Sequence, residues 1–226
     1  MPTLSWLQQE FSYGYDSGNI LALIPMGVRR SEEERSGGSY RRVFKKALQP
    51  YLCSDAKVLE LGPGRGSWSR AILRHIPHGE LHTVDFQDVT QWLKPENSSG
   101  RLICHQVQDN SFHGLPDGYF DVFWSFGVLC HNQTWSILDI LTRARGKMKP
   151  RAVAIHQYGD WEKLEAFGWD RGGVPQEFKS KTDEEIWWPR NDQRLMTKLA
   201  TEAGWEVLSA DLDLLQRDSL ILLRNP

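Results

Sequence analysis

The chain has 226 residues, 40% of them hydrophobic and 25% charged, which suffices for one core of ordinary single-domain size. Its formal net charge of −2, with acidic and basic residues mixed along the chain, argues against a nucleic acid or an anionic membrane as partner. Three cysteines, Cys53, Cys104 and Cys130, lie far apart, which argues against disulfides or a zinc site and fits a reducing cytoplasm. The early apolar run 20–26 is too short for a signal peptide or a membrane span, so we expect a soluble, cytoplasmic protein.

The first 55 residues are expected to form a helical cap in front of the main domain. Residues 3–11 could form a short helix, and residues 40–49 have the apolar spacing of an amphipathic helix that stops near Pro50. Residues 31–38 contain four charges in a row followed by Gly-Gly, a pattern that predicts a solvated loop.

Residues 56–226 alternate between strand and helix patterns. Such alternation predicts βαβ units, and hence an α/β fold with a mostly parallel seven-stranded sheet covered by helices on both faces. The last two strands are separated by a polar stretch that can form a hairpin, which would make the last strand antiparallel. The expected strands are 57–61, 80–86, 101–107, 120–126, 152–158, 205–210 and 219–223, and the expected helices are 67–75, 89–93, 134–148 and 192–203.

The strongest signal is the segment 58–68, in which a buried strand runs into a glycine-rich turn that opens a helix. Gly62, Gly64 and Gly66, with Pro63 between the first two, allow positive φ angles and close approach of a ligand to the backbone. The helix start then offers free N–H groups to that ligand. Glu60 precedes the glycines; it would repel a pyrophosphate but would suit a ligand with a cationic amino acid end.

This E-L-G-P-G-R-G segment resembles the first motif, E/D-x-G-x-G-x-G, of class I S-adenosylmethionine-dependent methyltransferases. The resemblance covers about residue 56 to the C-terminus and implies a Rossmann-like fold with S-adenosylmethionine as cofactor. It also implies that Asp85, about twenty residues after the last glycine, binds the two ribose hydroxyls. Asp109 and Asn110 close the third strand, where the family places the group that meets the adenine amino group.

Strand four ends in Ser125-Phe126-Gly127, similar to the family segment that passes under the methionine part of the cofactor. Phe86 and Phe126 are candidates to sandwich the adenine, although either could be a plain core residue. Residues 148–150, Met-Lys-Pro, resemble the family turn before strand five, but Arg151 and Ala152 replace its two glycines.

Methylation of a hydroxyl also requires removal of a proton, and a histidine near the strand ends could act as the base. His131 and His156 are the two candidates, and Asp160 could orient the ring of His156; a structural role for either histidine stays open. A magnesium site including His156, Asp160, Asn191 and Asp192 is a further alternative, but no tight acidic pair supports it, and we predict no metal.

The stretch 159–191 is a polar insertion of a length that is uncommon in compact domains and usually functional. In this superfamily a substrate lid is commonly inserted here. Trp161, Trp187 and Trp188 could form flat walls for an acceptor, or could instead attach the loop to the core. Tyr13 and Tyr15 could complete the lid from the N-terminal side.

The sequence thus predicts a methyltransferase acting on a small-molecule acceptor, with O-methylation of a hydroxyl in specialised metabolism as the leading hypothesis. The alternatives are an N- or carboxyl-methyltransferase, which needs no base, and a non-catalytic module that binds cofactor. The glycine turn alone would also allow a nicotinamide-dependent dehydrogenase. The oligomeric state, monomer or homodimer, is left open.

Overall fold

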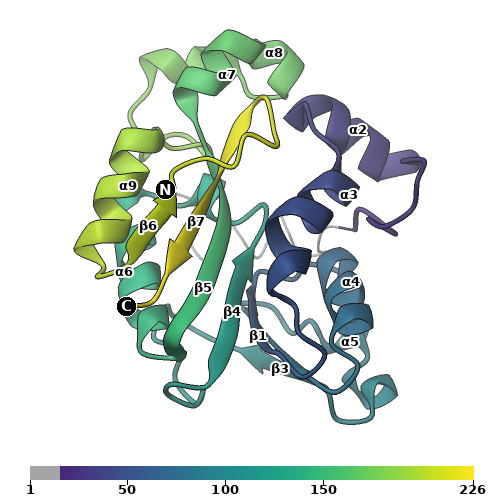
Figure 1. Ribbon diagram of the computed structural model, residues 1–226. Coiled ribbons are helices and arrows are strands. Elements are labelled where there is room, and N and C mark those ends of the chain that lie inside the picture. Colours follow the sequence, from purple (N-terminus) through teal and green to yellow (C-terminus); the bar gives the residue numbers. More distant parts are fainter. Residues whose placement is uncertain (1–15) are drawn as a thin grey trace.

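The computed structural model describes residues 16–226, and a seven-stranded sheet forms its centre (Figure 1). The strand order is β3-β2-β1-β4-β5-β7-β6, in which β7 runs antiparallel to both of its neighbours and the other pairs are parallel. The predicted fold class is therefore confirmed. The strands are β1 (Lys57–Leu61), β2 (Glu80–Asp85), β3 (Leu102–Gln106), β4 (Phe120–Ser125), β5 (Met148–Gly159), β6 (Glu206–Ser209) and β7 (Asp218–Arg224).

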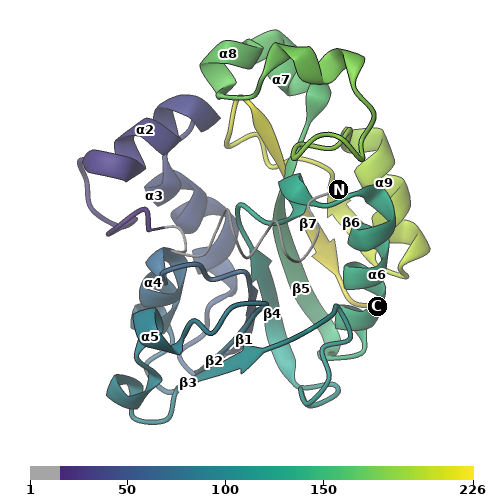
Figure 2. The same ribbon diagram turned by 180° about the vertical axis from the view of Figure 1, so that it is seen from behind.

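Helices cover both faces of the sheet, as Figures 1 and 2 show. Neighbouring strand residues point to opposite faces, so Val58 packs in the core beside α3 and α4, and Leu59 in the core beside α6 and α9. The α-helices are α2 (Gly27–Ser36), α3 (Tyr40–Val43), α4 (Ser67–His75), α5 (Thr90–Leu93), α6 (Thr134–Arg145), α7 (Trp161–Phe167), α8 (Trp169–Gly172) and α9 (Gln193–Glu202). Short 3-10 turns span Pro95–Ser98, Leu129–His131 and Gln176–Ser180.

The helix predicted over residues 40–49 exists but changes type along its length. α3 continues into a π-helical turn, Phe44–Leu48, and then a 3-10 turn, Gln49–Tyr51. Pro50 has no N–H to donate, so the α form cannot continue through it. The apolar side of this segment is fully buried against the sheet, which agrees with the amphipathic pattern.

The loop predicted over residues 31–38 is wrong, because most of this stretch belongs to helix α2. Glu33 pairs with Arg29 one turn earlier at 2.7 Å, which supports the helix. Arg29 is itself buried and donates to the carbonyls of Asn19 and Ala22. Gly37 ends the helix in the left-handed conformation (φ 67°) and returns its N–H to the Glu33 carbonyl.

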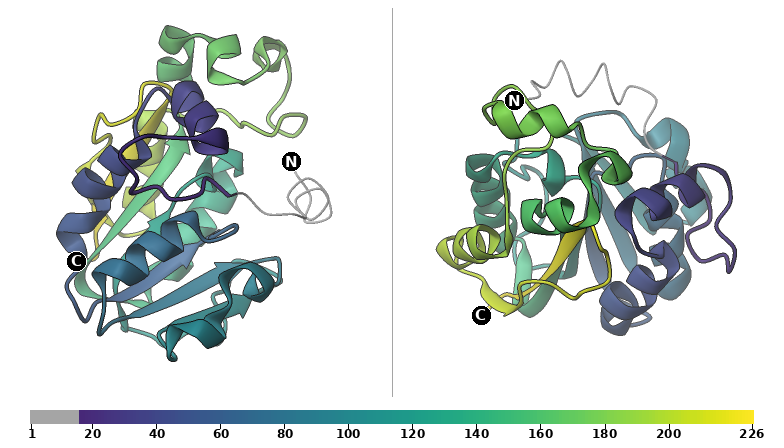
Figure 3. Two further views of the ribbon diagram at one scale, coloured as in Figure 1. Left: turned by 90° about the vertical axis from the view of Figure 1, so that its right-hand side faces the viewer. Right: turned by 90° about the horizontal axis from the view of Figure 1, so that it is seen from above.

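The insertion 159–191, called the lid segment below, forms α7, α8 and a 3-10 turn at one end of the sheet, with α2 beside it (Figure 3). A small apolar cluster that includes Leu164, Trp169, Phe178 and Trp188 packs inside it. Within residues 16–226, no helix combines the length and the apolar character that crossing a bilayer requires.

Candidate active site

A cavity of about 580 Å³ opens at the carboxyl ends of the parallel strands, where ligands of open α/β sheets bind. The ends of β1, β2 and β4 and the chain just after β3 form its floor. Above it lie residues of α2 on one side and residues of the lid segment on the other. Its volume is in the range of small-molecule sites.

The glycine turn after β1 forms one wall of this cavity, with Gly62, Pro63 and Gly64. Gly62, Gly64 and Gly66 all have positive φ, of 67°, 54° and 82°. A Cβ on Gly62 would come within 2.4 Å of a methyl group of Val128, so the turn has no room for a side chain there. No side chain caps the start of α4 within the described residues, which leaves its first N–H groups to a ligand.

Glu60 does not reach the cavity wall. Its side chain is buried between β1 and α4, and one carboxylate oxygen accepts a 2.5 Å hydrogen bond from the Ser69 hydroxyl. Burial raises the pKa of this carboxyl to about 7. In this arrangement Glu60 joins β1 to α4 and is not among the residues that line the cavity.

The acids predicted for the nucleoside end do line the cavity, together with Phe86 and Asn110. Asp85 ends β2 and accepts the Gln87 N–H at 2.9 Å, and burial raises the pKa of its carboxyl to about 6. Asp109 follows β3, where hydrogen bonds from Ser111 hold the pKa of its carboxyl below the usual value. Two acceptors thus stand at neighbouring strand ends, as a ribose and an adenine would require.

Three aromatic rings meet where β4 ends. Phe126 lines the cavity, and its ring centroid lies 4.9 Å from that of Tyr40 and 4.6 Å from that of Trp68. Tyr40 is the first residue of α3, so through this cluster α3 also contributes to the cavity wall. Ser125, predicted as a cofactor ligand, is fully buried and lies outside the wall.

His156 lies in the core rather than in the cavity. It is fully buried, its Nδ1 is 2.8 Å from the Ser125 hydroxyl, and its ring packs edge-on against Phe123 at 4.5 Å. Burial lowers the pKa of this imidazole to about 3. The next residue, Gln157, points to the other face of β5 and lines the cavity, where its Oε1 accepts the Gly127 N–H at 2.8 Å.

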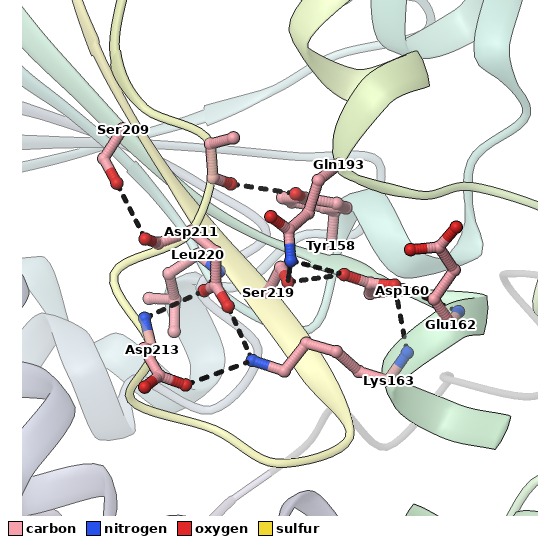
Figure 4. Close-up of polar contacts among 11 residues, drawn as sticks. Tyr158, Asp160, Glu162, Lys163, Gln193, Ser209, Asp211, Asp213, Ser219 and Leu220 are labelled. Atoms are coloured by element: carbon pink, nitrogen blue, oxygen red, sulfur yellow. Dashed lines mark hydrogen bonds and ion pairs between the residues drawn. The ribbon is translucent and has the colours of Figure 1, made fainter. Parts of the chain in front are cut away.

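The predicted pairing of Asp160 with His156 is wrong, because Asp160 is engaged elsewhere (Figure 4). It is the N-cap of α7, accepting the backbone N–H groups of Glu162 and Lys163. Its second oxygen accepts hydrogen bonds from Ser219 at 2.7 Å and Gln193 at 3.2 Å. Asp160 therefore joins the base of the lid segment to β7 and α9.

His131 is the predicted histidine that lines the cavity. Its Nδ1 lies 2.8 Å from the Trp187 carbonyl oxygen. A carbonyl only accepts, so Nδ1 carries the proton and Nε2 keeps the lone pair. Burial lowers the pKa of this ring, which keeps it neutral near pH 7.

The tryptophans of the lid segment differ in where their side chains lie. Trp187 and Trp188 line the cavity. Trp161 instead packs edge-on against Trp169 at 4.7 Å and donates its indole N–H to the Trp188 carbonyl. It therefore holds the lid segment together. Tyr13 and Tyr15 lie outside the described residues.

Arg217, which the sequence gave no reason to single out, connects the parts around the cavity. Its guanidinium pairs with Asp218, donates to the Gly172 carbonyl at 2.7 Å and lies 4.6 Å from the Trp188 ring centroid. Its backbone N–H donates to the Ser36 carbonyl at the end of α2. Helix α2 and the lid segment thus both contact Arg217, the first through its backbone and the second through its side chain, and Arg217 itself lines the cavity.

The family model described as "Methyltransferase domain" matches residues 32–210. The chain belongs to this family. The class I assignment, the S-adenosylmethionine cofactor and the enzyme class predicted from the glycine motif are thereby confirmed.

Solved structures share the fold of this methyltransferase at low sequence identity. Geranyl diphosphate C-methyltransferase from Streptomyces coelicolor gives a TM-score of 0.66 at 10% identity, over 100% of this chain and 99% of that one. A SAM-dependent methyltransferase from Aquifex aeolicus gives 0.59 at 15% identity, over 87% and 98%. Mitomycin 7-O-methyltransferase gives 0.58 at 16% identity, over 82% and 55%. No curated protein sequence matches the chain.

The methyltransferase's own residues fit the cofactor. The glycine turn places Gly62, Pro63 and Gly64 in the cavity wall, and the acids at Asp85 and Asp109 stand at the ends of neighbouring strands. Trp92, in α5, adds an aromatic wall beside them that sequence reasoning missed. Among residues 16–226, no three His, Cys, Asp or Glu side chains gather as ligands for a metal ion.

Proposed function

We propose that this methyltransferase methylates a hydroxyl group of a small molecule, with His131 as the general base. The observation that carries the proposal is the place of His131: its imidazole lines the cavity, and its Nδ1 lies 2.8 Å from the Trp187 carbonyl oxygen. This contact orients the ring, and we assign to Nε2 the removal of a proton from a bound acceptor hydroxyl.

In this proposal, different residues of the cavity wall bind the cofactor and orient the acceptor. S-adenosylmethionine supplies, when bound, a methyl group on a sulfonium. The glycine turn, Asp85 and Asp109 hold its nucleoside and fix its position over the strand ends. Trp187 and Trp188 provide flat apolar surface against which an acceptor can be oriented, and orientation alone supplies much of the acceleration of such transfers.

The size of the cavity supports a small acceptor rather than a polymer. Residues of α2 and of the lid segment line the cavity beside the strand ends, and its volume of about 580 Å³ is that of a small-molecule site. The near-neutral charge supports the absence of nucleic acid and membrane partners. The unpaired cysteines support a cytoplasmic location, which also belongs to this proposal.

Nitrogen or carboxylate methylation is the alternative, since such acceptors need no base. The structural neighbours include both an O- and a C-methyltransferase, so the likeness in fold does not choose the acceptor atom. His131 favours an acceptor that must lose a proton. A non-catalytic module is disfavoured by the intact cavity and glycine turn.

The test is a product screen with S-adenosylmethionine carrying a deuterated methyl group against hydroxylated metabolites, read by mass. With a substrate found, His131→Asn should lower kcat by about 10²-fold or more, the scale of a lost general base, and leave cofactor affinity within about twofold. His113→Asn, on an exposed histidine, is the matched control. A methyl group found on nitrogen or carboxylate, or full turnover by the His131 variant, would refute the proposal.

A further inference from the structure

Glu32, in helix α2, is a buried acid in the cavity wall. Its side chain is 8% exposed, and among residues 16–226 no donor makes a hydrogen bond of good geometry to either carboxylate oxygen; the Ser17 hydroxyl is near enough only to favour the ionised form. Buried carboxylates are normally paired, because an unpaired one loses its hydration without compensation. An isolated acid in a ligand cavity is therefore best explained by a ligand.

None of the described charged side chains near Glu32 forms an ion pair with its carboxylate. Glu33 already accepts from Arg29 and from the Tyr40 N–H, both at 2.7 Å. Asp16 is bound to Ser67 and Arg70. Burial raises the pKa of Glu32 to about 7, and the nearby Ser17 hydroxyl and the exposed Arg35 guanidinium offset only part of this rise, while Asp16 and Glu33 add to it.

The position of Glu32 points to one end of the cofactor. The other two acids in the described cavity wall, Asp85 and Asp109, stand at the nucleoside end. Glu32 shares the cavity wall with Ser17 and with Ser67, the residue directly after the glycine turn. Its helix leads into Tyr40, which packs on Phe126 at the end of β4.

The family resemblance places the methionine part of the cofactor in the region of the cavity that lies between the glycine turn and the end of β4. That part carries an ammonium group, which needs an acceptor of opposite charge. Glu60, the acid expected to supply it, is turned toward Ser69 in the core.

We propose that Glu32 binds the ammonium group of the amino acid end of S-adenosylmethionine. The acid for this group thus comes from helix α2 rather than from the glycine motif. The proposal rests on the cofactor and not on the acceptor, so it stands or falls separately from the O-methylation proposed above.

The experiment compares two ligands by calorimetry near pH 8. S-adenosylhomocysteine has the amino acid end, and 5′-methylthioadenosine has the same nucleoside and sulfur without it. Glu32→Gln should weaken S-adenosylhomocysteine by about tenfold or more, the scale of one charge-assisted hydrogen bond, and leave methylthioadenosine within about twofold. Glu34→Gln, on an exposed glutamate of the same helix that pairs with Arg30, should change neither ligand.

Two further measurements separate binding from folding. Glu32→Gln should not lower the melting temperature, because it removes an unpartnered buried charge. In the unaltered protein, the ratio of the two affinities should favour S-adenosylhomocysteine more as pH rises through about 7, because only ionised Glu32 attracts the ammonium. Equal weakening of both ligands in the variant, unchanged affinity for both, or a ratio independent of pH would overturn the proposal.

Discussion

Asp85 offers the most direct quantitative test of the cofactor site. Its carboxylate is the acceptor at the end of β2, and Asp85→Ala removes the two hydrogen bonds that ribose hydroxyls would donate to it. Loss of such a charge-assisted pair costs about 1–3 kcal/mol, which corresponds to about 5- to 150-fold in Kd. Calorimetry with S-adenosylhomocysteine measures this directly, and methylthioadenosine should lose as much because it contains the same ribose.

The same residue predicts a dependence on pH. Burial raises the pKa of Asp85 to about 6 in the free protein, and hydrogen bonds from a ribose favour the ionised form. Affinity for both ligands should therefore fall as pH is lowered through about 6, and Asp85→Asn should remove that part of the decline. Unchanged affinity in both variants, in folded protein, would show that the ribose is not bound here and refute the placement of the cofactor.

Three further outcomes follow from the same geometry. Gly64→Val, at φ 54°, should abolish S-adenosylhomocysteine binding while far-UV circular dichroism stays native; normal binding would place the site elsewhere. Trp187→Ala should lower acceptor turnover with cofactor affinity within about twofold, whereas Trp188→Ala, which empties a buried position, should also lower stability by about 3–5 kcal/mol in urea titrations. Burial raises the pKa of Glu60 from the ordinary 4.5 to about 7, so the free energy of unfolding should decline by up to about 3 kcal/mol as pH rises between these values. Glu60→Gln should flatten that decline, and an unchanged slope in the variant would contradict the assignment to Glu60.

Much of the fold was predictable because its signals are local. The strand Lys57–Leu61 and the helix Ser67–His75 have the predicted bounds, since a buried apolar run and a glycine turn mark them unambiguously. Helix α2 was not predictable in the same way. Its charge run resembles a solvated loop, and the carbonyls of Asn19 and Ala22 that receive the buried Arg29 are set by the tertiary fold.

The site shows the same division. The cavity positions of Asp85 and Asp109 follow from their places at strand ends, which a strand pattern predicts. Whether His156 or its neighbour Gln157 lines the cavity depends on which face of β5 each side chain occupies. Residues Val153 to Tyr158 are all buried, so the sequence carries no polar alternation from which that phase could be deduced. Glu32 and Arg217 reach the cavity only through contacts between distant segments.

The way the lid segment is attached has a consequence for engineering. Its two ends meet, since the Trp161 N–H donates to the Asn191 carbonyl at 2.9 Å and Asp160 is bound to β7 and α9. A segment whose ends already lie together can be exchanged for another of different length at little cost in loop closure. Chimeras cut at these two positions, keeping Asp160 and Asn191, would thus exchange the cavity-lining residues of this segment between two enzymes while the strands stay in place.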